Sequence, residues 1–185
     1  KHYAVHSGPE AERHSFDARP SAYDLADSYL PAFAALVREA GVEAVMGAYN
    51  RVDGEPACGS PRLLETILRQ GFGFEGHVVS DCWALKDFYL YHQVCEGPVE
   101  AAALAMNAGC DLNCGEVFRY LGAAIEAGLV SEARLDAAVT RLFTTRIKLG
   151  LLSDADPLGY DRIPYTAVDS AEHQALNLEA AERAI

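Results

Sequence analysis

The sequence predicts an α/β fold whose strands run parallel, as in a (β/α)8 TIM-type barrel. Its 185 residues are 50% hydrophobic and 23% charged, which is typical of a globular protein. Short β-rich runs alternate with longer helical patterns about four times before Gly150. A complete barrel has eight such units and takes about 250 residues. We therefore expect an incomplete barrel in this chain.

The first elements have clear start and stop signals. A short run at Lys1–His6 precedes a helix expected at Tyr23–Ala40. Ser21 is placed to cap this helix, and Gly41 is placed to end it. The next strand, Val42–Tyr49, is apolar at nearly every position, as expected when both faces of a strand are buried.

A second helix begins after Ser60, which is a suitable cap, and Pro61, which suits the first helical position. It is expected to end at Gly71. The strand His77–Ser80 follows, and Asp81 stands at its C-terminal end. The remaining elements before Gly150 are a helix, a short strand and two helices, at Val99–Asn107, Cys110–Asn113, Val117–Ala127 and Glu132–Leu149.

The composition divides the chain into three parts. Residues 1–150 hold the barrel elements, and residues 151–169 are rich in turn formers and are expected to be a linker. Residues 170–185 form a helical pattern that has no stop signal, so we expect the chain to be incomplete. A half barrel would also leave strand edges open. A doubly wound sheet is the alternative, but no G-x-G-x-x-G loop follows any strand.

Charge and hydropathy exclude two classes of partner. The formal net charge of −12 disfavours nucleic acid, whose phosphates would be repelled. There is no run of 18 or more apolar residues, so no membrane-spanning helix is expected. A neutral substrate such as a sugar is compatible with this charge.

The five cysteines do not form an even disulfide framework. We expect free thiols in a reducing compartment such as the cytoplasm, with a secreted or periplasmic protein as the alternative. Cys110 and Cys114, with Cys82 or a histidine, suggest a metal site, but zinc sites usually have tighter paired spacings such as C-x-x-C. No metal is therefore expected.

Polar residues stand where the predicted strands end, which is where parallel barrels collect their reactive groups. These positions are Lys1-His2, Tyr49-Asn50, Asp81 and Asp111. By position alone, Asp81 could either cap the following helix or act in catalysis. Trp83 offers a flat apolar face that suits a sugar ring and equally suits ordinary packing. Asp111 fits a structural role as well as a ligand contact.

Several stretches resemble glycoside hydrolase family 3. They are Lys1–Ala4, Val45–Cys58, Leu64–Leu68, Gly71–Gly76, Val78–Ala84, Ala108–Leu112 and Arg141–Leu152. The central motif is an apolar strand that ends in Ser80-Asp81 and continues into Cys82-Trp83. The resemblance runs in order through nearly the whole chain.

The resemblance implies a retaining, exo-acting β-glycosidase without a cofactor. Asp81 would be the nucleophile, while Lys1 and His2 would bind the hydroxyls of the sugar and Tyr49 would lie in the same subsite. Cys82 beside the nucleophile would crowd the C6 hydroxymethyl group and favour β-xylosides over β-glucosides. Trp83 completes the expected substrate-binding set. In the family, the general acid/base commonly comes from an αβα-sandwich domain, whose first helix would be residues 170–185.

The expected substrate is a small oligosaccharide or an aryl or alkyl β-glycoside. A homodimer is an open alternative for the oligomeric state. A β-N-acetylhexosaminidase of the same family is an alternative, because His6 has the spacing of that branch's catalytic histidine. The Pro-Gly that should precede this histidine is absent, so His6 is interpreted as structural or substrate-facing. A non-catalytic carbohydrate-binding remnant is the alternative from another class.

Overall fold

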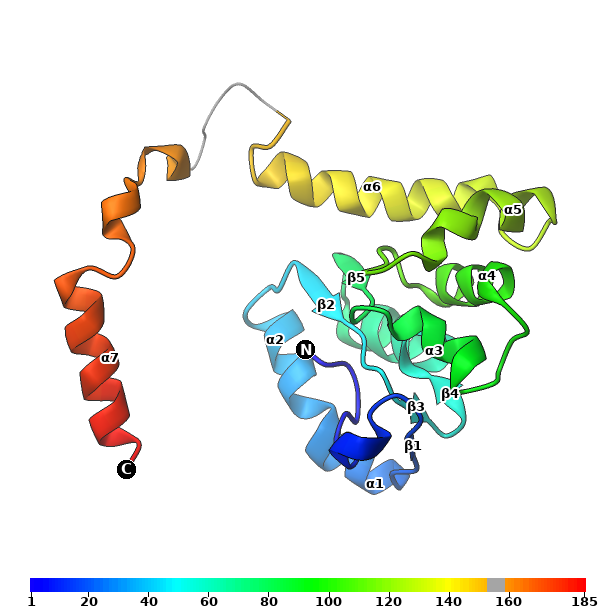
Figure 1. Ribbon diagram of the computed structural model, residues 1–185, viewed down its shortest axis with the longest axis horizontal. Coiled ribbons are helices and arrows are strands. Elements are labelled where there is room, and N and C mark those ends of the chain that lie inside the picture. The colour runs from blue at the N-terminus through cyan, green and yellow to red at the C-terminus, as the bar shows by residue number, and fades with distance from the viewer. Residues whose placement is uncertain (153–158) are drawn as a thin grey trace. The chain divides into compact units, whose positions relative to one another are not determined.

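The computed structural model describes residues 1–152 and 159–185 (Figure 1). The chain forms two compact units, Lys1–Thr145 and Arg146–Ile185. The predicted linker lies partly outside the described residues. Its described part contains two short 3-10 turns, Tyr160–Arg162 and Tyr165–Ala167.

Parallel strands at the centre of the first unit confirm the α/β class. β2 (Ala44–Met46) pairs in parallel with β5 (His77–Val79). Single parallel bridges extend this pairing on both sides, from Tyr3 to Gly47 and from Val79 to Leu112. The spatial order therefore follows the chain order, as in successive βα units. The predicted strands at 42–49 and 110–113 are shorter than expected.

The predicted cap at Ser21 is confirmed, but the helix that follows it is not continuous. Ser21 accepts a hydrogen bond from the amide of Asp24. The helix consists of α1 (Ala22–Asp24), a π-helical segment (Leu25–Tyr29) and α2 (Pro31–Arg38). Pro31 explains the break, because proline has no amide hydrogen and its ring clashes with the preceding turn.

The second predicted helix, Arg62–Gly71, is also confirmed, as a π-helical element. Ser60 Oγ accepts a hydrogen bond of 3.1 Å from the amide of Leu63. Its buried side chains include Leu63, Leu64 and Leu68, which belong to the main hydrophobic core. The Ser60 cap thus acts where the sequence placed it.

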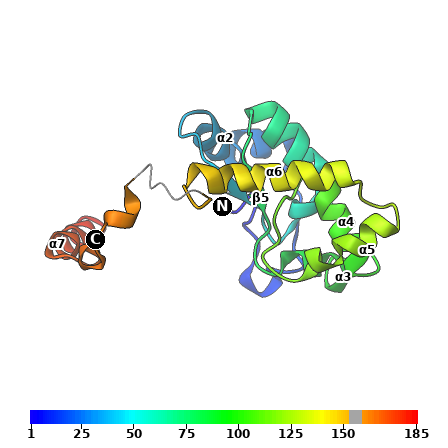
Figure 2. The same cartoon turned by 90° about the horizontal axis from the view of Figure 1, so that it is seen from above.

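The later helices agree with the prediction. They are α4 (Pro98–Ala108), a 3-10 turn (Val117–Tyr120) with α5 (Leu121–Glu126), α6 (Glu132–Lys148) and, in the second unit, α7 (Ala171–Arg183). Gly109 ends α4 with φ 117°, a left-handed backbone that favours glycine. Within the first unit, α6 runs beside β5 (Figure 2), where His77 Nδ1 lies 3.0 Å from Thr145 Oγ1.

Two features were not predicted. α3 (Ala84–Leu90) follows the Asp81 loop, and a small sheet joins β1 (Asp17–Ala18), β3 (Arg51–Val52) and β4 (Glu55–Pro56). These elements are too short to show a period in the sequence. Among the described residues, no helix is long and apolar enough to cross a bilayer.

Candidate active site

Asp81 lies directly after β5 with its side chain 13% exposed. Its Oδ1 accepts a hydrogen bond of 2.8 Å from the amide of Cys82. Its Oδ2 lies 3.2 Å from His2 Nε2. The helix-capping interpretation is wrong, because Trp83 occupies the cap position of α3 and no side chain caps that helix. One carboxylate oxygen is held in place, and the other faces His2.

Tyr49 joins this group from the segment that follows β2. Its hydroxyl donates a hydrogen bond of 2.6 Å to the carbonyl of Cys82 and also interacts with the Asp81 carboxylate. Burial, and then the negative charge of Asp81, raise the pKa of Tyr49. The phenol therefore stays protonated, and its single hydrogen is donated to the carbonyl of Cys82 beside Asp81.

His2 and Lys1 line a pocket of about 360 Å³ that Asp81 itself does not line; His2 connects the two through its contact with Asp81. Burial lowers the pKa of His2, and this effect exceeds the opposing influence of the Asp81 charge. His6 lines the same pocket, with its ring centroid 5.1 Å from that of His2 and its Nδ1 3.3 Å from Asn50 Oδ1. Lys1 is exposed. The pocket thus combines exposed and half-buried donors, of which His2 contacts the Asp81 carboxylate.

A disulfide between Cys82 and Cys114 corrects the prediction that every cysteine is a free thiol. The structure leaves three free cysteines, Cys58, Cys95 and Cys110. The two bonded cysteines lie in the loops after neighbouring strands, a proximity that their separation of 32 residues does not reveal. The bond also removes both from the metal-site alternative. Within the described residues, no three metal-ligating side chains converge.

Trp83 lies next to the disulfide and is 49% exposed. Its backbone is left-handed, with φ 69°, which costs a non-glycine residue about 1–2 kcal/mol. Its amide donates a hydrogen bond of 2.7 Å to the carbonyl of Cys114. Lys86 Nζ lies 4.6 Å from the centre of the indole ring. The two loops thus hold a half-exposed aromatic face beside Asp81.

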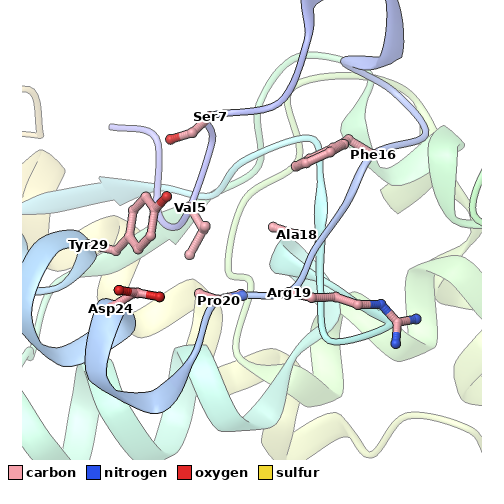
Figure 3. Close-up of a pocket in the computed structure, with 8 residues that line it drawn as sticks. All are labelled: Val5, Ser7, Phe16, Ala18, Arg19, Pro20, Asp24 and Tyr29. Atoms are coloured by element: carbon pink, nitrogen blue, oxygen red, sulfur yellow. The ribbon is translucent and has the colours of Figure 1, made fainter.

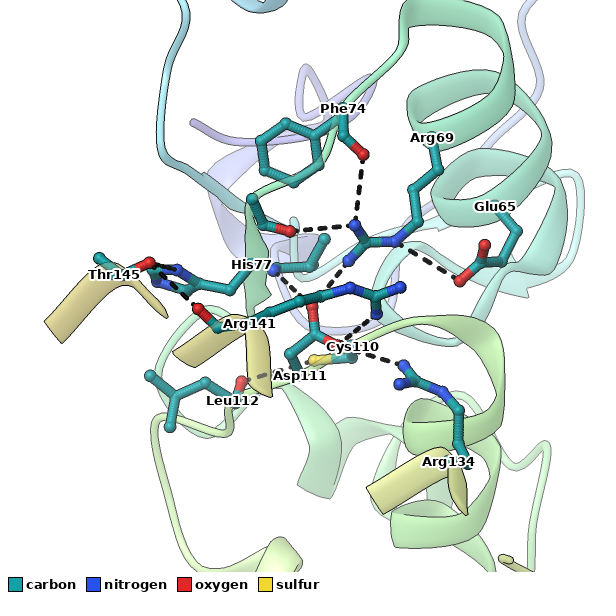
Figure 4. Close-up of polar contacts among 12 residues, drawn as sticks. Glu65, Arg69, Phe74, His77, Cys110, Asp111, Leu112, Arg134, Arg141 and Thr145 are labelled. Carbon is teal, nitrogen blue, oxygen red and sulfur yellow. Dashed lines mark hydrogen bonds and ion pairs between the residues drawn. The ribbon is translucent and has the colours of Figure 1, made fainter. Parts of the chain in front are cut away.

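Asp111 has a structural environment. Its side chain is fully buried and contacts three arginines: Arg69 at 2.7 Å, Arg141 at 2.9 Å and Arg134 at 3.3 Å (Figure 4). Its Oδ2 also accepts a hydrogen bond of 2.9 Å from the amide of Val78. The carboxylate is enclosed by donors, so the structural interpretation of this residue holds.

A second pocket, of about 250 Å³, contains none of the predicted site residues. Figure 3 shows that Asp24 and Tyr29 lie together in it, while the guanidinium of Arg19 points away from them. Arg19 instead pairs with Asp17 at 2.9 Å. This pocket therefore supplies no group to Asp81.

Two residues near the site, His14 and Asp87, are not among the residues predicted from the sequence. His14 Nδ1 lies 2.8 Å from Asp87 Oδ2, and the His14 ring packs against Tyr49. The two residues are 73 positions apart, and neither lies at a predicted strand end. No local signal in the sequence could have paired them.

Comparison with known proteins agrees with this geometry. The model of the glycosyl hydrolase family 3 N-terminal domain matches residues 1–145. The chain is 43% identical over 192 residues to a probable exo-1,4-beta-xylosidase of Aspergillus clavatus, covering 100% of the chain and 25% of that protein. It is 43% identical over 188 residues to a xylan 1,4-beta-xylosidase of Xylanibacter ruminicola, covering 100% of the chain and 22% of that protein.

Solved structures show the same similarity. A family 3 exo-beta-xylosidase in complex with a xylobiose aziridine probe superposes with a TM-score of 0.91 at 30% identity, over 98% of this chain and 24% of that chain. A beta-glucosidase from Listeria innocua superposes with a TM-score of 0.82 at 32% identity, over 95% of this chain and 24% of that chain. The chain thus spans about a quarter of the length of these relatives. It belongs to glycosyl hydrolase family 3 and matches the N-terminal domain of that family.

Proposed function

We propose that this chain is part of a retaining, exo-acting β-glycosidase that removes terminal β-D-xylosyl or β-D-glucosyl residues. The observation that carries the proposal is the placement of Asp81. One of its oxygens is fixed by the Cys82 amide, and the other lies 3.2 Å from Nε2 of His2, a residue that lines the pocket. A carboxylate held in this way can attack an anomeric carbon with little rearrangement.

The proposed reaction has two displacement steps. First, Asp81 Oδ2 forms a bond to the anomeric carbon while the bond to the leaving oxygen breaks and an acid protonates that oxygen. Water then attacks the same carbon, loses a proton to the same acid/base and releases Asp81. The acid/base carboxylate has to lie about 5–5.5 Å from Asp81. We assign it to a following domain, as the family resemblance implies.

Lys1 and His2 would hold the hydroxyls of the sugar in this mechanism. Both line the pocket beside Asp81, and an ammonium and an imidazole N–H can donate to hydroxyl oxygens. The hydroxyl of Tyr49 would stay on the carbonyl of Cys82, beside the nucleophile Asp81. Trp83 would offer its half-exposed ring to the substrate.

We propose a preference for β-xylosides over β-glucosides. Cys82 and its disulfide partner Cys114 stand directly beside the nucleophile, where they would crowd the C6 hydroxymethyl group that glucose has and xylose lacks. Relatives of both kinds, named xylosidases and glucosidases, resemble this chain. Crowding of this kind changes discrimination by about 1–3 kcal/mol. The ratio of kcat/KM for paired aryl β-xyloside and β-glucoside substrates measures the preference.

We also propose the domain arrangement that the resemblance implies. Residues 1–150 would be the C-terminal half of the barrel, residues 151–169 a linker and residues 170–185 the first helix of an αβα sandwich. The parallel order of the strands in the first unit supports the barrel assignment. The cap at Ser170, which accepts from the amide of His173 at 3.3 Å, supports a helix that begins there.

The Asp81→Asn variant of the complete protein tests the proposal. We expect turnover of an aryl β-xyloside to fall by roughly 10³-fold or more, because the nucleophile is removed. The exposed Asp136 on α6 provides a matched control, and Asp136→Asn is expected to keep wild-type turnover. Undiminished turnover in Asp81→Asn contradicts the assignment.

A 2-deoxy-2-fluoro xyloside would trap the glycosyl-enzyme. Peptide mass spectrometry is expected to place the label on Asp81, as covalent catalysis requires. Binding without a label supports the carbohydrate-binding alternative. Turnover of an aryl β-N-acetylglucosaminide, with none of xylosides or glucosides, supports the hexosaminidase alternative and contradicts this proposal.

A further inference from the structure

A histidine from a distant loop reaches the elements around Asp81. His14 Nδ1 lies 2.8 Å from Asp87 Oδ2. Asp87 belongs to α3, the helix that begins directly after the Asp81 loop, and its side chain is 4% exposed. A buried carboxylate is stable only with a hydrogen-bond partner. His14 supplies the side-chain partner.

The same imidazole packs against Tyr49. The two ring centroids are 4.7 Å apart and the planes make an angle of 65°, an edge-to-face contact. The hydroxyl of Tyr49 lies at the other end of the phenol, on the carbonyl of Cys82 and beside Asp81. His14 therefore links α3 to Tyr49, whose hydroxyl lies on Cys82 beside Asp81.

We propose that His14 and Asp87 form a positioning pair for the glycosidase reaction. The Asp87 carboxylate orients the His14 ring, the edge of that ring fixes the tilt of Tyr49, and the Tyr49 hydroxyl, bonded to the carbonyl of Cys82, holds the loop whose Cys82 amide binds Asp81. Neither member of the pair touches the sugar. This inference rests on the proposed role of Asp81 as the nucleophile.

The geometry separates this role from simple stabilisation. An ionised carboxylate only accepts hydrogen bonds, so the Asp87 contact places the proton of His14 on Nδ1 and fixes the plane of the ring. Tyr49 cannot rotate toward His14 without a clash at an edge-to-face distance of 4.7 Å. A small displacement of reacting groups, about 1 Å, can cost about 100-fold in rate. The expected effect therefore falls on kcat rather than on substrate binding.

Two variants of His14 in the complete protein separate the two contacts. His14→Phe keeps a ring against Tyr49 but loses the hydrogen bond to Asp87, and His14→Asn keeps a donor but loses the ring. We expect both to lower kcat about 10- to 100-fold with little change in KM. The His14 side chain is 45% exposed, so both variants are expected to fold.

Asp87 tests the pair from the other side. Asp87→Asn has the same size and keeps an oxygen that accepts from His14 Nδ1, so kcat is expected to stay close to wild type. Asp87→Leu has no acceptor and is expected to lose as much kcat as His14→Phe. An equal loss in both Asp87 variants overturns the proposal.

A double-mutant cycle provides a readout that a purely structural role would not move. In a Tyr49→Phe background, the effect of His14→Phe on kcat is expected to shrink, because without its hydroxyl the ring at position 49 no longer passes its tilt on to Cys82 and Asp81. The exposed His173 on α7 offers the matched control, and His173→Phe is expected to leave kcat unchanged in both backgrounds. Additive effects of His14→Phe and Tyr49→Phe, or unchanged kcat in both His14 variants, overturn the positioning role.

Turnover of the wild-type protein and of Asp81→Asn distinguishes a failure of the positioning pair from a failure of the proposed function. Active wild-type protein and inactive Asp81→Asn support the proposed function, whatever the His14 variants do. Failure of the positioning pair then concerns His14 and Asp87 alone. Full turnover in Asp81→Asn instead overturns both.

Discussion

Three carboxylates of the first unit, Asp81, Asp87 and Asp111, differ in what surrounds each side chain. Asp81 is partly exposed, with one oxygen on an amide and the other facing His2. Asp87 is buried against His14, and Asp111 is enclosed by arginines. Asp81 contacts His2, which lines the pocket of about 360 Å³. Its surroundings, rather than its residue type, make it the candidate nucleophile.

Asp87 gives a pH-dependent prediction at this scale. Burial raises the pKa of its carboxyl from 3.8 to about 6, against the opposing effects of the His14 hydrogen bond and charge. The folded state therefore binds this proton more tightly than the unfolded state. The resulting stabilisation is fully present below the unfolded value of about 3.8 and is lost as the pH rises through about 6.

The side chain at position 87 has no titratable proton in Asp87→Asn, so this variant does not lose stability in this way as the pH rises. We expect the free energy of unfolding of the wild type to fall relative to that of Asp87→Asn as the pH rises from about 4 to about 7. Urea unfolding of both proteins over a pH series measures the difference. A difference that stays constant with pH contradicts the raised pKa.

At the scale of elements, Asp111 joins parts of the chain that are distant in sequence. Arg69 comes from the helix before β5, while Arg134 and Arg141 come from α6. The amide of Val78, which lies in β5, also donates a hydrogen bond to Asp111. One buried carboxylate thus ties a helix, a strand and α6 within the first unit (Figure 4).

Asp111→Asn would leave three arginines facing each other without the balancing charge. We expect a loss of about 3–5 kcal/mol in the free energy of unfolding, which is typical when one member of a buried ion pair is removed. Asp53→Asn is the matched control, because the Asp53–Arg62 pair at 2.8 Å is 41% and 47% exposed. That change is expected to cost less than about 1 kcal/mol. Equal costs in urea unfolding contradict the role of Asp111.

At the scale of the whole molecule, the disulfide changes the expected environment of the protein. Disulfides persist in oxidising compartments, so we now expect a secreted or periplasmic protein rather than a cytoplasmic one. Thiol titration of the unfolded protein checks the pairing. Cys82 and Cys114 should stay unreactive until a reductant is added, while the other three cysteines react at once.

Cys82→Ser and Cys114→Ser provide the matching variants. Each is expected to lose about 2–4 kcal/mol of stability and to free its partner for titration. Five reactive thiols in the unreduced wild-type chain contradict the disulfide.

The sequence alone determined the class of fold and the main catalytic candidate. Glycines, serine caps and apolar runs are local signals, so they located β2, β5 and most helices. Asp81 became a candidate because it follows a buried strand, and the family resemblance, rather than its position, gave it the expected role of nucleophile. The break at Pro31 and the short α3 were missed, because neighbouring contacts decide elements of a few residues.

Only the tertiary structure decided how the site is assembled. It brought His2 and Tyr49 to Asp81, joined Cys82 to Cys114, and paired His14 with Asp87. The two cysteines of the disulfide are 32 residues apart in sequence, and His2 and Asp81 are 79 residues apart. Local patterns describe the backbone near each residue, whereas side-chain partners depend on how whole strands and helices pack. That packing is fixed only when the chain has folded.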